Sequence, residues 1–472
     1  MDEIKSFLKS SALYFVGNVL SKVILIVLLP VYTKYLQPSD YGYYDVSIAY
    51  LSIATSVLFF DIWNAVLRFM YEDENNKYKP IYSGGLIYLL SLFLYIIVLI
   101  CFNYFYNIRF FEWILLYGIT LTLQSFYTSI TRGLGKNLTY AISGLISTFI
   151  SAIVNILLIV GFGMDSSSIY IAGIISILFQ VLYLEYSVKV IKRFSVKIID
   201  KELMKKMFLF AAPLCINSLS FWLLTGYNRV AITTFLSTYE NGLYSVASRI
   251  GSILTMVSMC FSLAWQEVAF SKKGSDSQKG VFFSQAFNLY FKVMTYSTVL
   301  ILSFIYFLFP LIIDFSYESA KNYIPLYLMG AMLSILSNFL GTIFGNIMKT
   351  KIILISTISG AVVNALLIKP LIDKFGVNGA SISLIIGFLV TIIIRSLILL
   401  RNINFKINFK FLIYSIILVG VSIIVYIKAN NSMVLSAFIC TFILVAIDFR
   451  MEIKKIITLL KNRKRRNTNE NY

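Results

Sequence analysis

Histidine is absent from this 472-residue chain, and charged residues make up only 13% of it. The chain therefore lacks the side chain that most often carries protons near neutral pH and that most often binds zinc. The only four cysteines are separated along apolar runs and form no CxxC pair; they are Cys101, Cys215, Cys260 and Cys440. This spacing indicates buried thiols rather than a disulfide framework or a metal site. We expect no metal and no other cofactor.

Hydrophobic residues make up 58% of the chain, and 41 Lys and Arg against 22 Asp and Glu give a formal net charge of +19. In a soluble protein such a charge would indicate a nucleic-acid partner. Here the apolar residues come in runs of about 20, the length that crosses a bilayer core as a helix. The composition therefore predicts an all-α polytopic membrane protein, with membrane lipid rather than nucleic acid around it.

The apolar runs predict about fourteen transmembrane helices and no inserted soluble domain. They lie near residues 12–33, 43–66, 82–103, 112–131, 138–162, 169–188, 208–235, 243–268, 284–313, 325–347, 352–369, 379–400, 411–428 and 433–448. With this count, 30 cations fall in the loops on the side of the two termini, 6 in the opposite loops and 5 inside spans. Since positive loops stay in the cytoplasm, we expect a cytoplasmic membrane protein with both termini cytoplasmic.

The first half of the chain partly repeats in the second. At an offset of 200 residues Gly42 matches Gly242, and nine of fourteen residues agree between 146–159 and 355–368. Six spans separate the copies, so their orientation is the same, as in transporters whose two halves surround a central cavity. We predict a six-helix lobe over 1–190, a basic cytoplasmic linker over 191–207, a second six-helix lobe over 208–400, two additional transmembrane helices over 401–449 and a basic cytoplasmic tail over 450–472.

Polar side chains inside the predicted spans recur at helical spacing, and several are cationic. A charge at mid-bilayer costs about 2.5–3.5 kcal/mol, so such groups normally face the bundle interior or water. Hydrogen bonds between helices would equally explain the Ser and Thr residues, and Arg395 lies near a span end, where it would reach the interface. The candidates for substrate binding are Lys22, Arg229, Arg249, Asn18, Asn228, Ser252, Gln266 and Lys292. Asp61 and Glu267 are the candidates for coupling to an ion.

Two stretches of the chain carry a recognisable set of residues. The first has Asn18, Ser21-Lys22, Pro30, Thr33, Leu36, Pro38 and Tyr41-Gly42, and the second has Pro213-Leu214, Arg229, Ile232, Phe235-Leu236, Gly242, Tyr244-Ser245 and Ala247. Both stretches resemble bacterial polysaccharide transporters, the oligosaccharide flippases of the multidrug/oligosaccharidyl-lipid/polysaccharide (MOP) exporter superfamily. The family often has Asp-Arg where this chain has Asn228-Arg229.

The resemblance implies translocation of an undecaprenyl-diphosphate-linked oligosaccharide, an O-antigen, capsule or exopolysaccharide unit, from the inner to the outer leaflet. It also implies alternating access, with Lys22, Arg229 and Arg249 in contact with phosphates or charged sugars. The partners that it implies are a polysaccharide polymerase and other glycan-assembly proteins.

Three alternatives remain at the level of sequence. A peptidoglycan-precursor flippase would share the fourteen spans and the basic cavity, whereas a drug antiporter of the same superfamily would need acids there. A lipid-linked glycan polymerase or glycosyltransferase would need catalytic residues in sizeable outer loops, often paired acids for base chemistry. The outer loops here are short and none holds an acid pair with a base, so we expect no enzyme. A membrane scaffold for glycan assembly would not need buried cations.

Overall fold

The computed structural model describes residues 24, 26–72, 76–193, 198–271, 276–347, 349–403, 405–428 and 430–450, and between 260 and 277 it describes the side chain of Phe261 alone. Within these ranges every regular element is a helix. The first half holds α2 (Leu29–Tyr35), α3 (Pro38–Phe59), α4 (Ile62–Glu72), α5 (Tyr78–Tyr106), α6 (Phe111–Gly133), α7 (Asn137–Ile156), the π-helix η1 (Leu157–Gly161), α8 (Ser167–Val188) and the 3₁₀ turn η2 (Ile191–Arg193).

The second half begins with a long helix that a proline does not end, because Pro213 lies inside it. Its elements are α9 (Lys201–Thr225), α10 (Tyr227–Phe235), α11 (Thr238–Ser271), α12 (Asp276–Ile312), the 3₁₀-helix η4 (Phe315–Tyr323), α13 (Ile324–Asn346), α14 (Thr350–Phe375), α15 (Val377–Ile403), α16 (Phe409–Lys428) and α17 (Asn431–Asp448). Each predicted span from the second to the fourteenth coincides with one helix or with a broken pair. The first, 12–33, lies mostly outside the described residues.

Ten of the described helices are long and apolar enough to cross a membrane, and α3 together with α4 makes up to eleven. Helix α6 is not among the ten, since its charged, amide and hydroxyl side chains lower its mean hydropathy. The prediction of an all-helical polytopic membrane protein is confirmed.

The predicted continuous helix over 43–66 is wrong at one point. The chain bends by 48° between α3 and α4. At the break Phe60 and Asp61 both take left-handed backbone conformations, with φ of 53° and 48°. Non-glycine residues rarely adopt this region, and hydropathy contains no signal for it. Asp61 itself is buried at this break, with 4% of its surface exposed.

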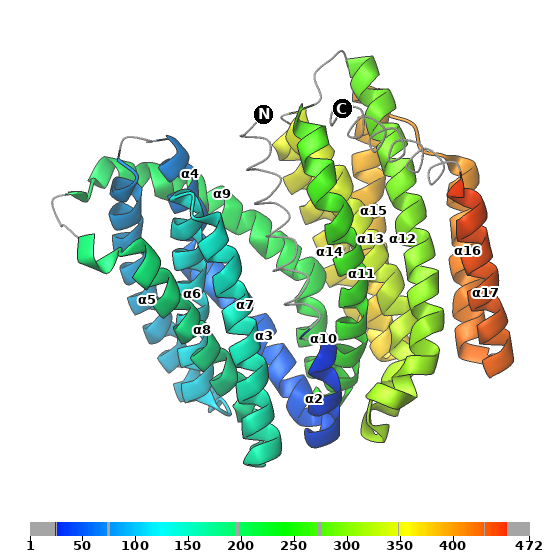
Figure 1. The fold of residues 1–472 in the computed structure, drawn as a ribbon, viewed down its shortest axis with the longest axis horizontal. Coiled ribbons are helices and arrows are strands. Elements are labelled where there is room, and N and C mark those ends of the chain that lie inside the picture. Colours follow the sequence, from blue (N-terminus) through cyan, green and yellow to red (C-terminus); the bar gives the residue numbers. More distant parts are fainter. Residues whose placement is uncertain are drawn as a thin grey trace, which may run out of the picture.

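The helices form two groups that are joined at one end (Figure 1). In the first group α5 and α6 pack against α3 and against α4, and α8 packs between α6 and α7. In the second group α13 packs between α11 and α15, α14 packs on α15, and α16 and α17 lie on the far side of α12. Helix α9 contacts both groups, through α4 and α14. The groups meet where α3 and α11 begin and lie apart where α4 ends and α12 begins (Figure 1).

The contact at the joined end is reciprocal. A Cβ added to Gly42 would lie 1.9 Å from the carbonyl oxygen of Thr238, and one added to Gly242 would lie 1.9 Å from the carbonyl oxygen of Pro38. Thr238 follows Pro38 by the same 200 residues that separate the two glycines. An exchange of partners of this kind is what a two-fold axis produces. The first and second halves therefore face each other as copies of one unit, with α3 and α11 crossing backbone to backbone.

Candidate functional site

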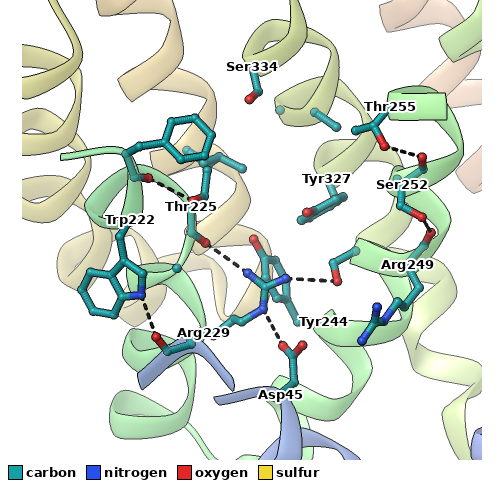
Figure 2. A pocket seen from close by; sticks show the side chains of 18 of the residues that line it. Asp45, Trp222, Thr225, Arg229, Tyr244, Arg249, Ser252, Thr255, Tyr327 and Ser334 are labelled. Carbon is teal, nitrogen blue, oxygen red and sulfur yellow. Dashed lines mark hydrogen bonds and ion pairs between the residues drawn. The ribbon is translucent and has the colours of Figure 1, made fainter. Parts of the chain in front are cut away.

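A cavity of about 520 Å³ lies between the two groups, directly beyond the contact of α3 with α11. Figure 2 shows its polar side chains pointing toward one another from α3, α9, α10, α11 and α13. The residues that line it are Asp45, Ile48, Ala49, Ser52, Phe221, Trp222, Thr225, Gly226, Arg229, Tyr244, Ser248, Arg249, Gly251, Ser252, Thr255, Tyr327, Gly330, Ala331, Ser334, Ile335, Asn338, Leu384 and Phe388. The cavity is thus the meeting place of both halves of the repeat.

Arg229 enters the cavity from α10, a short helix that begins after the break at Gly226. Its Nε donates to Oδ2 of Asp45 on α3 at 2.6 Å, Nη1 donates to the Thr225 carbonyl at 3.2 Å, and Nη2 donates to Ser248 Oγ at 3.4 Å. The Arg229 side chain is 22% exposed and that of Asp45 is 8% exposed. The first cation of the cavity therefore has a carboxylate partner, which belongs to the opposite group of helices.

Arg249 enters from α11 and has a different environment. Its Nε donates to the Tyr41 hydroxyl at 3.2 Å, and no carboxylate of the described side chains lies within ion-pair distance of it. Ser252, one turn further along α11, donates to the Arg249 carbonyl at 2.6 Å and also lines the cavity. Two guanidinium groups and one carboxylate give this end of the cavity a net positive charge. Such a site attracts anions, and Arg can bind phosphate or carboxylate through paired hydrogen bonds.

Aromatic side chains form much of the remaining wall. Trp222 is fixed by a hydrogen bond from its Nε1 to the Ala49 carbonyl on α3, at 2.8 Å. Tyr244 and Tyr327 pack edge to face with ring centroids 5.3 Å apart, and Phe221 and Phe388 also line the space. Rings that present a flat apolar face beside hydroxyl groups of Ser and Thr suit an amphipathic ligand.

Two predicted binding residues lie outside this cavity. Asn228 is fully buried; its Nδ2 donates to the Ala380 carbonyl at 2.8 Å, and its Oδ1 accepts from Asn364 at 3.0 Å. These two bonds join α10 to α14 and α15. The side chain of Asn228 therefore has a structural role between helices, and the polar pattern that predicted a binding residue does not distinguish the two roles. Lys292 lies on α12 with its Nζ 5.6 Å from the centroid of the Phe411 ring, facing α16.

Four other predicted residues cannot be placed by their side chains. Asn18 and Lys22 lie outside the described residues, and so do the side chains of Gln266 and Glu267. Asp61, the other coupling candidate, is 4% exposed at the break between α3 and α4 and accepts a hydrogen bond from Ser218 Oγ at 2.6 Å. It does not line the cavity. Of the predicted set, the structure brings together Arg229, Arg249 and Ser252.

Sequence reasoning missed Asp45 and misplaced Arg395. Asp45 lies inside a predicted span, and this was a usable signal, because an acid in a span needs a partner. Arg395 was expected at the interface but is 3% exposed, and its guanidinium donates to Ser356, to the carbonyl and hydroxyl of Ser337, and to Thr357. It braces α13, α14 and α15 within the second group. The described residues contain no group of three His, Cys, Asp or Glu side chains arranged to hold a metal ion.

Comparison with solved structures finds the same fold in membrane transporters. The lipid II flippase MurJ in an inward closed conformation matches with a TM-score of 0.66 at 16% identity, over 94% of this chain and 100% of that one. A multidrug resistance MATE family transporter of the MOP superfamily matches in its inward-facing conformation with a TM-score of 0.65 at 13% identity, over 80% and 93% of the two chains. An outward-facing conformation of such a transporter matches with a TM-score of 0.58 at 15% identity, over 83% of this chain and 94% of that one.

The sequence itself gives a more specific answer. No curated protein matches the chain significantly. Residues 7–270, more than half of the chain, match the family described as polysaccharide biosynthesis protein. This match spans both stretches that carried the resemblance, and the fold is that of the matched flippase and exporter structures. The chain therefore belongs to the polysaccharide biosynthesis protein family and is a multi-pass membrane protein with the fold of these solved transporters.

Proposed function

We propose that this protein moves an undecaprenyl-diphosphate-linked oligosaccharide, an O-antigen, capsule or exopolysaccharide unit, from the inner to the outer leaflet of the cytoplasmic membrane. The observation that carries the proposal is Arg249, a partly buried cation on the wall of the central cavity, whose described neighbours supply a phenol but no ion pair. A diphosphate would complete its coordination. Charged side chains in a bilayer normally have a partner, and a cation left without one marks a ligand path.

The remaining wall fits the rest of such a substrate. Sugars present hydroxyl groups at their edges and C–H groups on their faces, and the cavity offers Ser252, Thr255 and Ser334 beside Trp222 and Tyr327. A volume of about 520 Å³ falls within the ordinary range for ligand pockets, about 300–1,000 Å³. It accommodates a headgroup, whereas the polyprenyl chain would stay in the surrounding lipid.

Alternating access follows from how the two groups are joined. We take residues 1–190 and 208–400 as the two moving lobes, with the basic linker 191–207 between them and both termini in the cytoplasm. On that orientation, the lobes are apart on the cytoplasmic side and together on the outer side. The higher TM-score with the inward-facing than with the outward-facing exporter supports this assignment. A polysaccharide polymerase would receive the substrate on the outer side.

Ion coupling is assigned to Asp61. Its carboxylate is buried at a helix break, where it has a hydroxyl partner, Ser218, on α9. The bond joins two helices from opposite halves of the chain, so a change in the charge of Asp61 alters a contact that must rearrange when the lobes move.

A peptidoglycan-precursor flippase is the second candidate. It is favoured by the match to lipid II flippase MurJ, which covers 94% of this chain and the whole of the other. Both substrates share the lipid diphosphate and differ in the attached glycan. Deleting the gene separates the two: loss of a surface polysaccharide with normal growth supports the proposal, and lysis supports the second candidate.

The test of anion binding uses purified protein in nanodiscs with undecaprenyl diphosphate as the probe. Replacement Arg249→Gln removes a charge-assisted hydrogen bond worth about 1.5–3 kcal/mol, so the Kd should rise roughly 10- to 150-fold. The matched control is Lys292→Gln, which removes a cation from a neighbouring helix outside the cavity and should leave the Kd unchanged. If both replacements raised the Kd equally, Arg249 would contribute to binding only through the overall charge of the protein, and the proposed contact with the diphosphate would be wrong.

A further inference from the structure

The ion pair of Arg229 with Asp45 has a property that the other described ion pairs lack. It joins α10 of the second group to α3 of the first, and it lies on the wall of the central cavity. The pairs Arg68–Glu72, Arg109–Asp40 and Arg109–Asp165 stay within the first group, and Lys79–Asp200 joins α5 to the residue before α9. A ligand in the cavity can therefore reach the bond that joins the two groups.

We propose that Asp45 is a displaceable counter-ion: it holds α3 against α10 while the cavity is empty, and an anionic substrate takes its place on Arg229. This inference rests on the proposed function, since it assumes that the substrate brings a diphosphate into the cavity. Through Asp45, the opening of the joined end then depends on a bound anion.

The charges around Asp45 favour this exchange. A guanidinium has five N–H donors, and these three hydrogen bonds of Arg229 use one on each nitrogen. One N–H on each Nη remains, for the neighbouring Tyr327 hydroxyl or for a ligand. Arg249 lines the same cavity and already lacks a carboxylate. A diphosphate carries more negative charge than one carboxylate and can contact both arginines, so Arg229 keeps a counter-ion when Asp45 leaves. The exchange thus avoids the cost of a buried charge without a partner.

The positions of the three groups determine the direction of the effect. Both arginines belong to the second group, on α10 and α11, whereas Asp45 belongs to the first, on α3. An anion bound to the arginines repels Asp45 and so pushes α3 away from α10 and α11. Three other hydrogen bonds between the groups have uncharged acceptors: Trp222 donates to the Ala49 carbonyl, Asn241 to the Gly42 carbonyl, and Arg249 to the Tyr41 hydroxyl.

The experiment measures a distance across the joined end. Spin labels are placed at Asn107, after α5, and at Asp373, near the end of α14, in protein whose four native cysteines are replaced by serine. Both positions are exposed. Double electron–electron resonance in nanodiscs then reports the separation of the groups, with undecaprenyl diphosphate as the anionic probe and undecaprenol as the uncharged one.

We expect a short distance for the unliganded protein and at least a tenfold rise in the ratio of long to short distances with undecaprenyl diphosphate, but not with undecaprenol. Asp45→Asn should show the long distance without any lipid. Asp45→Ser, which introduces the residue found at the equivalent position 245, should do the same and guards against misfolding of one variant. The control is Asp40→Asn. Asp40 lies on α3, as Asp45 does, but its ion pair with Arg109 stays inside the first group, so this variant should behave as the unaltered protein.

A short distance in both Asp45 variants without lipid would overturn the proposal, and so would an equal response to undecaprenol. Its failure and that of the proposed function are separable. If undecaprenyl diphosphate binds but neither it nor the Asp45 variants lengthen the distance, the counter-ion role is wrong and the substrate class stands. If the Asp45 variants open the joined end and the lipid does not bind, the ion pair of Asp45 with Arg229 does hold the joined end closed, and the substrate class is wrong.

Discussion

Replacement of Gly42 by alanine should open the joined end of the molecule without unfolding it. The added Cβ would lie 1.9 Å from the Thr238 carbonyl oxygen and 2.5 Å from the Gly242 nitrogen, and both are backbone atoms that cannot turn aside. Because a Cβ essentially never comes closer than 3.0 Å to another heavy atom, α3 and α11 must separate by at least about 1.1 Å, the difference between 3.0 and 1.9 Å.

The size of the effect follows from the cost of overpacking. Forcing an extra carbon into a close contact costs about 1–3 kcal/mol. Here the cost falls on the closed state alone, since the two helices are apart when the end is open. A free-energy difference of that size changes the ratio of open to closed molecules by about 5- to 150-fold. The intrinsic helix gain of alanine over glycine, up to about 1 kcal/mol, applies to both states and cancels in this ratio.

The assay is the same distance measurement between labels at 107 and 373, together with thermal unfolding in detergent. The matched control is Gly144→Ala on α7, where an added Cβ meets nothing within 4 Å. We expect Gly42→Ala to lengthen the distance and Gly144→Ala to leave it unchanged, with both proteins folded. An unchanged distance in folded Gly42→Ala would refute the reasoning, because it would mean that the contact relaxes locally.

Three further changes test separate parts of the molecule. Asp61→Asn should abolish the dependence of transport on an ion gradient while leaving binding of undecaprenyl diphosphate intact; transport in proteoliposomes that still follows the gradient would exclude Asp61. Arg395→Lys should destabilise the protein by about 3 kcal/mol, since a single ammonium cannot replace the bonds to Ser337, Ser356 and Thr357; unchanged unfolding in detergent would contradict this. Hydrogen bonds from Lys79 and from the backbone at the start of α9 hold the pKa of Asp200 below its ordinary value. The stability from the Asp200 carboxylate is thus present above its ordinary pKa and disappears as the pH falls through the lowered value, so Asp200→Ala should lower the unfolding temperature at pH 7 and lose this difference in acid.

Hydropathy and the repeat predict most of this fold, because a bilayer requires long apolar helices and a duplication copies their order. The same signals cannot predict the break at Asp61. There the apolar run continues, and the chain bends because two residues adopt a backbone conformation that composition does not encode. The position of the gap between the groups is likewise a property of one conformation rather than of the sequence.

The site was predictable where charge decides it and not where packing does. Arg229 and Arg249 line the cavity, as expected for cations inside predicted spans. Asn228 is also a polar residue inside a predicted span, but its side-chain amide forms hydrogen bonds with Ala380 and Asn364. Only the contact of α10 with α14 and α15 in the folded chain reveals these bonds. Asp45 was accessible to the same argument as the arginines, since an acid in a span needs a partner.

The reciprocal contact of Gly42 with Gly242 also has a consequence for the orientation of cargo. An ancestral pair of identical units would have offered a ligand two equivalent poses, exchanged by the axis. In the fused chain, the position equivalent to Arg229 is Leu29, the one equivalent to Arg249 is Ala49, and the one equivalent to Asp45 is Ser245. Divergence after duplication has thus left both cations on one side of a symmetric frame and the acid on the other. On the proposed function, the anionic end of the substrate therefore has one pose in that frame, against α10 and α11, instead of two.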